Sequence, residues 1–223
     1  MMKSDILNEI GRRRQTDKQG GAERGHDYLR KYEFFLRPLR EEAFTLLELG
    51  VFQGASLKTW EEYFPKAEII GVDCEAAAAL HAGGRVSVIL GDLNRPGFLE
   101  SLPGLNPRVV IDDASHTWQD QLLALFVIYP ALMSGAIYIV EDIHTSFPPL
   151  DALFHSGQKH SPFEILLKTA EYMTGNERPS PIIPEKNLEP LSRHELFDEE
   201  IRLMAEQTEA ITFIERACVL IKK

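Results

Sequence analysis

Two short stretches of the sequence place carboxylates where they could do chemistry. "VVIDDASHTWQD" carries Asp112, Asp113 and His116, and "GAIYIVED" ends on Glu141 and Asp142. Each is an apolar run that stops abruptly on charge, which is typical of a buried strand reaching the edge of a sheet. Neighbouring strands lie about 4.8 Å apart, so these acids would gather within a few ångströms. Like charges that close raise one another's pKa unless a cation neutralises them.

A divalent metal ion would neutralise this cluster directly. Side chains alternate along a strand, so both acids of a pair can bind an ion only where the chain leaves β geometry, and we expect three ligands. They are Asp113, Glu141 and Asp142. Because all the ligand atoms are oxygens, Mg²⁺ fits better than Zn²⁺, and Mn²⁺ is an alternative.

His116 is the candidate general base. It follows Asp113 by three residues, which is expected to place it on a loop above the ion. An imidazole with an unperturbed pKa of about 6.5 can take a proton from a hydroxyl held there. A lone histidine in a loop is more often a surface residue, but its offset from a metal carboxylate favours catalysis.

The elements that position these residues are predicted by apolar runs alternating with segments of helical period. Strands are expected at 44–50, 67–73, 85–92, 107–113 and 135–142, and helices at 55–65, 74–84, 117–135, 161–173 and 194–210. This pattern predicts a parallel sheet whose ligand edge is the carboxyl edge of its strands. The closing "AITFIERACVLIKK" predicts two strands around Glu215-Arg216, which must pair antiparallel because a parallel pair needs a longer connection.

The first strand is followed by a glycine turn in "LLELGVFQGAS", with Glu48 in front of Gly50 and Gly54. A dinucleotide site would carry G-x-G-x-x-G, whereas this turn has only G-x-x-x-G. A carboxylate there repels phosphate and pairs with an ammonium or sulfonium group, so the turn favours S-adenosylmethionine over NAD.

Further acids end the next two strands. Asp73 is expected to take the ribose hydroxyls and Asp92 to reach the adenine side. Both could instead be strand-end caps, and Asp112 either faces the cofactor or caps its strand. The candidate cofactor contacts from these segments are Glu48, Gly50, Val51, Gly54, Ser56, Asp73, Asp92 and Asp112.

Composition excludes several other classes of protein. The 223 residues carry a net charge of -10, which argues against nucleic acid as a partner. Cys74 and Cys218 show no disulfide framework or metal spacing, and no run approaches the roughly 20 apolar residues that span a bilayer. We therefore expect a soluble, cytoplasmic protein with no membrane partner and a single domain.

Taken together, these stretches resemble the metal-dependent, S-adenosylmethionine-dependent O-methyltransferases of natural-product biosynthesis, which act on sugar hydroxyls of macrolides and related aglycones. The matching stretches are "TDK" with "HDYLRKYEFF", "LLELGVFQGASLKTWEEYFPKAEIIGVD", "VVIDDASHTWQDQ", "YPALMSGAIYIVEDIHTSF" and "ITFIERACVLIKK". Two departures are Gln15, where the family usually has glycine before "TDK", and Ala114, which replaces the glycine of "DDGSH" and could alter the loop that carries His116.

The resemblance implies an α/β fold of the class I methyltransferase (Rossmann-like) type, with a mostly parallel sheet, an antiparallel last strand and helices on both faces. It implies Mg²⁺ at Asp113, Glu141 and Asp142, with His116 as the base. It also implies that the segment around Thr16 and Tyr28 folds over the cofactor.

The expected reaction is methyl transfer to a hydroxyl of a small molecule, by one domain over 1–223 that forms a homo-oligomer. That domain would have a helical cap at 1–42 and a variable substrate-side segment at 147–192. One alternative keeps the fold and methylates a phenol or catechol, with Phe147, Phe154 and Phe163 as an aromatic wall. An NAD(P)-dependent oxidoreductase and a non-catalytic binding module are the others.

Overall fold

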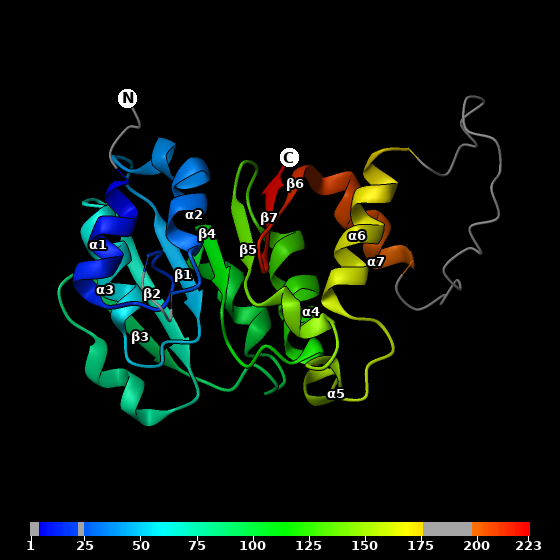
Figure 1. The fold of residues 1–223 in the computed structure, drawn as a ribbon, viewed down its shortest axis with the longest axis horizontal. Helices are drawn as coiled ribbons and strands as arrows, with labels where there is room; N and C mark the ends of the chain where they lie inside the picture. The colour runs from blue at the N-terminus through cyan, green and yellow to red at the C-terminus, as the bar shows by residue number, and fades with distance from the viewer. Residues whose placement is uncertain (1–4, 22–24, 176–197) are drawn as a thin grey trace.

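The computed structural model describes residues 5–21, 25–175 and 198–223, and within them seven strands form one sheet (Figure 1). Its order is β3-β2-β1-β4-β5-β7-β6. Strands β1 to β5 pair in parallel, whereas β7 pairs antiparallel with both β5 and β6. The strands are β1 (Thr45–Leu49), β2 (Glu68–Asp73), β3 (Val86–Leu90), β4 (Pro107–Asp112), β5 (Ile137–Val140), β6 (Thr208–Ile214) and β7 (Ala217–Lys222). The predicted parallel sheet with its antiparallel end is confirmed.

Helices cover both faces of the sheet (Figure 1). One face packs against α1 (Ile6–Arg14), α2 (Tyr28–Leu36) and α3 (Ala55–Tyr63), and the other against α4 (Trp118–Ile128), α6 (Pro162–Met173) and α7 (Asp198–Gln207). Shorter elements are η1 (Arg37–Leu39), η2 (Ala76–His81), η3 (Leu99–Leu105), η4 (Tyr129–Ala131), η5 (Ile143–Ser146) and α5 (Asp151–Phe154).

Alternation along the strands divides the core between these faces. In β1, Leu46 packs with the α1–α3 side, whereas Leu47 and Leu49 pack with the α4–α6 side. In β4, Val109 and Val110 divide in the same way. Strands buried on both faces read as continuous apolar runs, which is why the sequence predicted them well.

Three predicted helices differ from the structure by more than two residues at one end or in the type of helix. The helix expected at 117–135 ends at Ile128 and continues only as the η4 turn, because Pro130 has no N–H to donate. The helix expected at 74–84 is the 3₁₀ segment η2. The described part of the helix expected at 194–210 ends at Gln207, since Thr208–Ile214 pairs with β7. The proline-rich stretch at 179–190, part of the variable segment expected at 147–192, lies outside the described residues.

The ends of β1, β4 and β5 lie in register, which builds the edge that carries the predicted site. Leu49 pairs with Asp112, and Asp112 pairs with Val140. The ladder runs one residue further, because Asp113 N donates to Leu49 O at 2.9 Å. At this point Gly50 has φ +91°, and a Cβ there would lie 2.2 Å from Asp113 O. A glycine is therefore required for the turn to pass so close to β4.

Candidate active site

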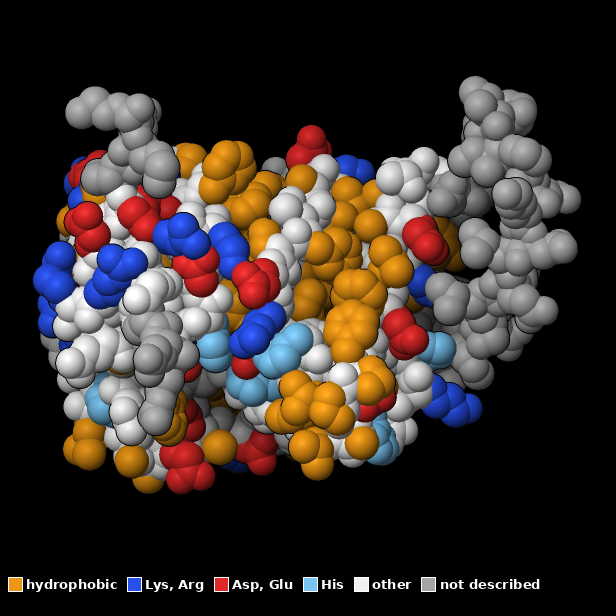
Figure 2. All heavy atoms as spheres, in the orientation of Figure 1, with side chains coloured by type: hydrophobic (Ala, Val, Ile, Leu, Met, Phe, Trp, Pro, Cys, Tyr) orange, Lys and Arg blue, Asp and Glu red, His pale blue; other side chains and the backbone are white. Residues whose placement is uncertain are grey.

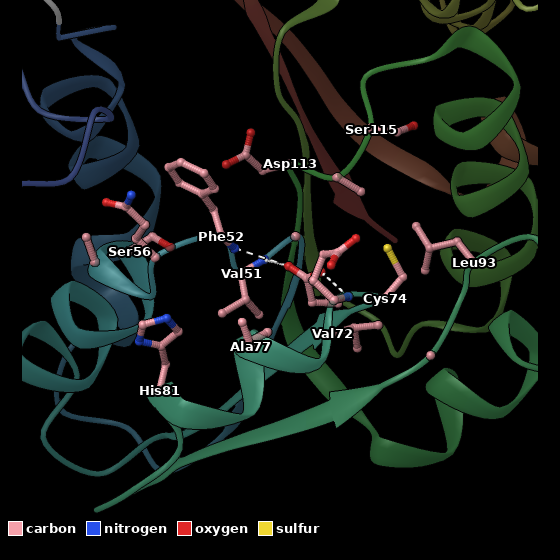
Figure 3. A pocket seen from close by; sticks show the side chains of 18 of the residues that line it. Val51, Phe52, Ser56, Val72, Cys74, Ala77, His81, Leu93, Asp113 and Ser115 are labelled. Atoms are coloured by element: carbon pink, nitrogen blue, oxygen red, sulfur yellow. Dashed lines mark hydrogen bonds between the residues drawn. The ribbon is translucent and has the colours of Figure 1, made fainter.

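A cavity of about 700 Å³ opens at the carboxyl edge of β1, β2 and β3, next to the end of β4 (Figure 3). Figure 3 shows Asp113 and Ser115 at one end of the cavity and His81 at the other. Six of the predicted cofactor contacts line it: Thr16, Gly50, Val51, Ser56, Asp73 and Asp92. The cavity also takes in Gln15 and Asp17 from the segment between α1 and α2.

Two strand-end acids on the cavity are held by backbone amides. Asp73 Oδ2 accepts from Val51 N at 2.8 Å and Phe52 N at 3.1 Å, so this carboxylate fixes the glycine turn. Burial alone would raise the pKa of Asp73, but hydrogen bonds from backbone amides lower it by more. The resulting pKa lies below its usual value. Asp92 Oδ1 accepts from Asn94 N at 2.8 Å. Both acids thus cap their strands and also face the cavity, and their contact with a cofactor stays a prediction.

Four other predicted cofactor contacts do not line the cavity: Tyr28, Glu48, Gly54 and Asp112. Glu48 is fully buried and accepts from Ser56 Oγ at 2.8 Å and Trp60 Nε1 at 3.1 Å. Burial raises its pKa to about 7. Gly54 precedes α3 with φ +70°. For all four, contact with a cofactor stays a prediction.

Asp112 does not line the cavity and is buried on the α4 side of the core. Tyr138 Oη donates to its Oδ2 at 3.4 Å, and the carboxyl is 2% exposed. Burial raises the pKa of Asp112 to about 8. Asp112 also accepts a backbone hydrogen bond from Ala114, as a residue that caps a strand would.

Asp113, His116 and Asp142 come together beside the cavity. They offer one ligand atom each, and these atoms all lie within 4.8 Å of one another. His116 Nε2 is 3.5 Å from Asp142 Oδ2 and 3.9 Å from Asp113 Oδ1. Among the described residues, this is the one group of acids, histidines or cysteines with metal-binding geometry.

Two of these residues, His116 and Asp142, have a left-handed backbone conformation, which sets the direction of their side chains. Asp142 is the second residue after β5 and has φ +54°, so the chain has left β geometry at this acid. His116 has φ +59°, whereas Ala114 does not have a positive φ. The change from the family's glycine to Ala114 therefore meets no backbone strain here.

Asp142 receives a hydrogen bond from the N-terminal part of the chain. Tyr28 Oη donates to Asp142 Oδ1 at 2.5 Å. Burial raises the pKa of Asp142, but the Tyr28 bond and the nearby His116, His26 and His144 lower it below its usual value. Asp142 is thus held ionised, as a metal ligand must be.

Glu141, the third predicted ligand, is turned toward Lys18 instead. Lys18 Nζ lies 2.7 Å from Glu141 Oε2, donates also to Asp113 Oδ2, and lies 3.7 Å from Glu48 Oε1. Lys18 therefore neutralises part of the charge of the carboxylates that the sequence analysis expected a metal ion to neutralise. Lys18 belongs to the matched "TDK" stretch, but nothing in its type or spacing indicated this contact.

On the face in Figure 2, histidine side chains gather beside exposed hydrophobic side chains. Phe147 directly follows η5, and its ring lies 4.8 Å from that of Phe163. The Phe163 ring lies 5.4 Å from that of Phe213. Phe147 is 45% exposed, so aromatic surface is open to a ligand here.

Comparison with known proteins identifies natural-product methyltransferases as relatives. No family model matches the sequence. The chain is 35% identical over 133 residues to 8-demethyl-8-alpha-L-rhamnosyl tetracenomycin-C 2'-O-methyltransferase of Streptomyces olivaceus, covering 56% of this chain and 35% of that protein. It is 32% identical over 153 residues to L-olivosyl-oleandolide 3-O-methyltransferase of Streptomyces antibioticus, covering 64% and 38%. The chain thus spans little more than a third of the length of these relatives.

A solved structure shows the same fold. MycE methyltransferase from the mycinamycin biosynthetic pathway, in complex with Mg and SAH, superposes with a TM-score of 0.76 over 99% of this chain and 55% of that one, at 22% identity. The resemblance seen in the sequence is therefore confirmed. The chain has the class I methyltransferase fold and, over more than half of its length, is similar in sequence to O-methyltransferases that act on sugars of natural products.

Proposed function

We propose that the protein transfers a methyl group from S-adenosylmethionine to a hydroxyl of a small molecule, such as a sugar of a natural product, with Mg²⁺. The observation that carries this proposal is the position of Asp113, which lines the cavity and also belongs to the carboxylate–histidine cluster. A donor in the cavity and a hydroxyl at the cluster would meet there. Positioning of the two reactants then supplies much of the rate gain.

The cavity fits the donor. The glycine turn lets a ligand approach the backbone of Gly50 and Val51, and Asp73 and Asp92 face the space from the next two strands. At about 700 Å³, the cavity has the volume usual for a cofactor site. The relatives' names and the SAH in the MycE complex support the same donor.

The cluster fits a divalent ion. Asp113 and Asp142 supply carboxylate oxygens, which suit Mg²⁺ or Mn²⁺, and His116 lies within reach of both. Glu141 Oε1 and His116 Nδ1 are buried without a hydrogen-bond partner among the described residues, so both atoms remain available as ligands. A bound ion would lower the pKa of the acceptor hydroxyl and orient it toward the donor.

His116 is proposed as the base, although its position also allows it to be a ligand. Its Nε2 faces both carboxylates, and its side chain is one quarter exposed, so an acceptor can reach it. If His116 is the base, His116→Ala should lose turnover and keep its affinity for Mg²⁺. If His116 is a metal ligand, His116→Ala should lose both. Calorimetric Mg²⁺ titration beside a turnover assay separates the roles, with His155→Ala as the control histidine.

The aromatic surface of Phe147, Phe163 and Phe213 supports an acceptor with an apolar part. It also favours a second candidate, methylation of a phenol or catechol, in which the ring itself would stack on these side chains. The relatives' names favour the sugar hydroxyl. The acceptor is the part of the proposal that most needs experiment.

The test is S-adenosylhomocysteine production from a panel of glycosides and phenols, with and without EDTA. We expect turnover with at least one glycoside, its loss in EDTA and its recovery with Mg²⁺. Turnover that is unaffected by EDTA would remove the metal from the proposal. NAD(P) binding without S-adenosylmethionine binding would remove methyl transfer itself.

We also propose a single methyltransferase domain that assembles as a homo-oligomer in the cytoplasm. Both cysteines are free thiols, which supports a reducing compartment. None of the helices in the described part of the chain has the length and hydrophobicity needed to cross a bilayer. Phe34 is 80% exposed on α2, which supports a contact between copies. Light scattering of the purified protein tests the assembly.

A further inference from the structure

Lys18 is a buried cation that the proposed reaction does not use. Its side chain is 2% exposed, and its ammonium contacts Asp113, Glu141 and Glu48, so one positive charge serves three carboxylates. Burial lowers the pKa of Lys18, but these three charges raise it well above its ordinary value. Removing one partner from such a buried group leaves uncompensated charge. The ion pairs therefore fix where this part of the chain lies.

The same segment forms a wall of the cavity. Gln15, Thr16 and Asp17 directly precede Lys18 and line the space. The backbone of Lys18 also accepts from Tyr28 N at 2.9 Å and Leu29 N at 3.1 Å. Lys18 thus connects the cavity wall to the first turn of α2.

Two side chains tie this segment to the metal cluster. Lys18 reaches Asp113, and Tyr28 reaches Asp142. Both acids are proposed metal ligands, and they lie just beyond the ends of β4 and β5, far along the chain. The position of the cavity wall therefore depends on the same carboxylates that would hold the ion.

We propose that Lys18 is a positioning residue that holds Gln15, Thr16 and Asp17 against the cofactor through its ion pairs with Asp113 and Glu141. The inference rests on the proposed function, because it assumes S-adenosylmethionine in this cavity. Lys18 acts through the wall it positions. Since it shares Asp113 with the ion, it also opposes metal binding electrostatically.

The test is calorimetric binding of S-adenosylhomocysteine in metal-free buffer, followed by a separate Mg²⁺ titration. Lys18→Met keeps most of the side-chain length and removes the charge. We expect S-adenosylhomocysteine affinity to fall by about tenfold or more, while Mg²⁺ affinity stays level or rises. Lys18→Arg keeps the charge and should restore most of the affinity.

Lys222→Met is the matched control, because Lys222 is also buried, with its ammonium on Pro130 O at 2.9 Å and Tyr129 O at 3.2 Å. It lies at the opposite edge of the sheet, where Lys222 N bonds to Ala136 O before β5 begins. Its S-adenosylhomocysteine affinity should stay within about twofold of wild type. An equal loss in both variants would indicate a general cost of removing a buried lysine and would overturn the proposal.

Folded Lys18→Met that binds S-adenosylhomocysteine as wild type does would also overturn it. If Lys18→Met does not fold, two other variants test the same segment with little change in side-chain volume. Glu141→Gln weakens the contact with Lys18, and Tyr28→Phe removes the hydrogen bond to Asp142. Unchanged affinity in both would then contradict the inference. Wild-type protein that fails to bind S-adenosylhomocysteine would instead contradict the proposed function.

Discussion

At the scale of single residues, buried carboxylates dominate the site and set its response to pH. Glu48 is the clearest case, because burial raises its pKa from 4.5 to about 7. Below its unfolded pKa the carboxyl is protonated in both states and costs nothing. Above that pH the unfolded chain releases the proton while the folded protein, with its pKa of about 7, still holds it, so stability is lost between about pH 4.5 and 7.

Glu48→Gln removes that cost and retains an acceptor for Ser56 and Trp60. We expect the variant to gain stability relative to wild type as pH rises from 4.5 to 8, by up to about 3 kcal/mol. Urea unfolding at several pH values measures the difference. Glu68→Gln, at an exposed position, should show no such trend. A constant offset between Glu48→Gln and wild type would contradict a raised pKa.

The sequence predicted which residues meet at the site better than it predicted which charges pair. Asp113, His116 and Asp142 were placed by their strands, because parallel strands bring their carboxyl ends to one edge. Lys18 was missed because its partner Asp113 lies 95 residues away and its segment has no periodic pattern to place it. Tyr28 was linked to the site through the resemblance alone, and its hydrogen bond to Asp142 follows from tertiary packing.

At the scale of elements, strands buried on both faces were predictable, and helix ends were less so. Pro130 carried a stop signal inside the helix expected at 117–135, and the structure follows the proline. The end of α7 had no such local signal. It is set by the strand Thr208–Ile214, which pairs with β7. Local propensity does not contain that long-range contact.

The start of α6 tests local signals directly. Ser161 and Glu164 form a capping box, in which Ser161 Oγ accepts from Glu164 N at 3.2 Å and Glu164 Oε2 accepts from Ser161 N at 2.8 Å. We expect Ser161→Ala to destabilise the protein by about 1 kcal/mol, a fall in Tm of roughly 2–4 °C. Ser156→Ala, outside any helix and exposed, is the control. Equal Tm values for the two variants would show that the cap contributes nothing.

At the scale of the whole molecule, the fold concentrates negative charge at one edge of its sheet. The chain has a net charge of -10, and the segments that follow β4 and β5 bring Asp113, Glu141 and Asp142 together. Lys18 compensates only part of this charge. A cation that binds the folded state and not the unfolded chain should therefore stabilise the entire domain.

Mg²⁺ at about 100 times its dissociation constant should add about 2.7 kcal/mol, which corresponds to a rise in Tm of roughly 5–10 °C for a domain of this size. Asp142→Asn removes one proposed ligand and should abolish most of that rise. Asp151→Asn, at the start of α5 and outside the cluster, should retain it. Scanning calorimetry in EDTA and in Mg²⁺ measures both. An equal Mg²⁺-dependent rise in the two variants would place the ion elsewhere, because Asp142, unlike Asp151, belongs to the cluster with Asp113 and His116.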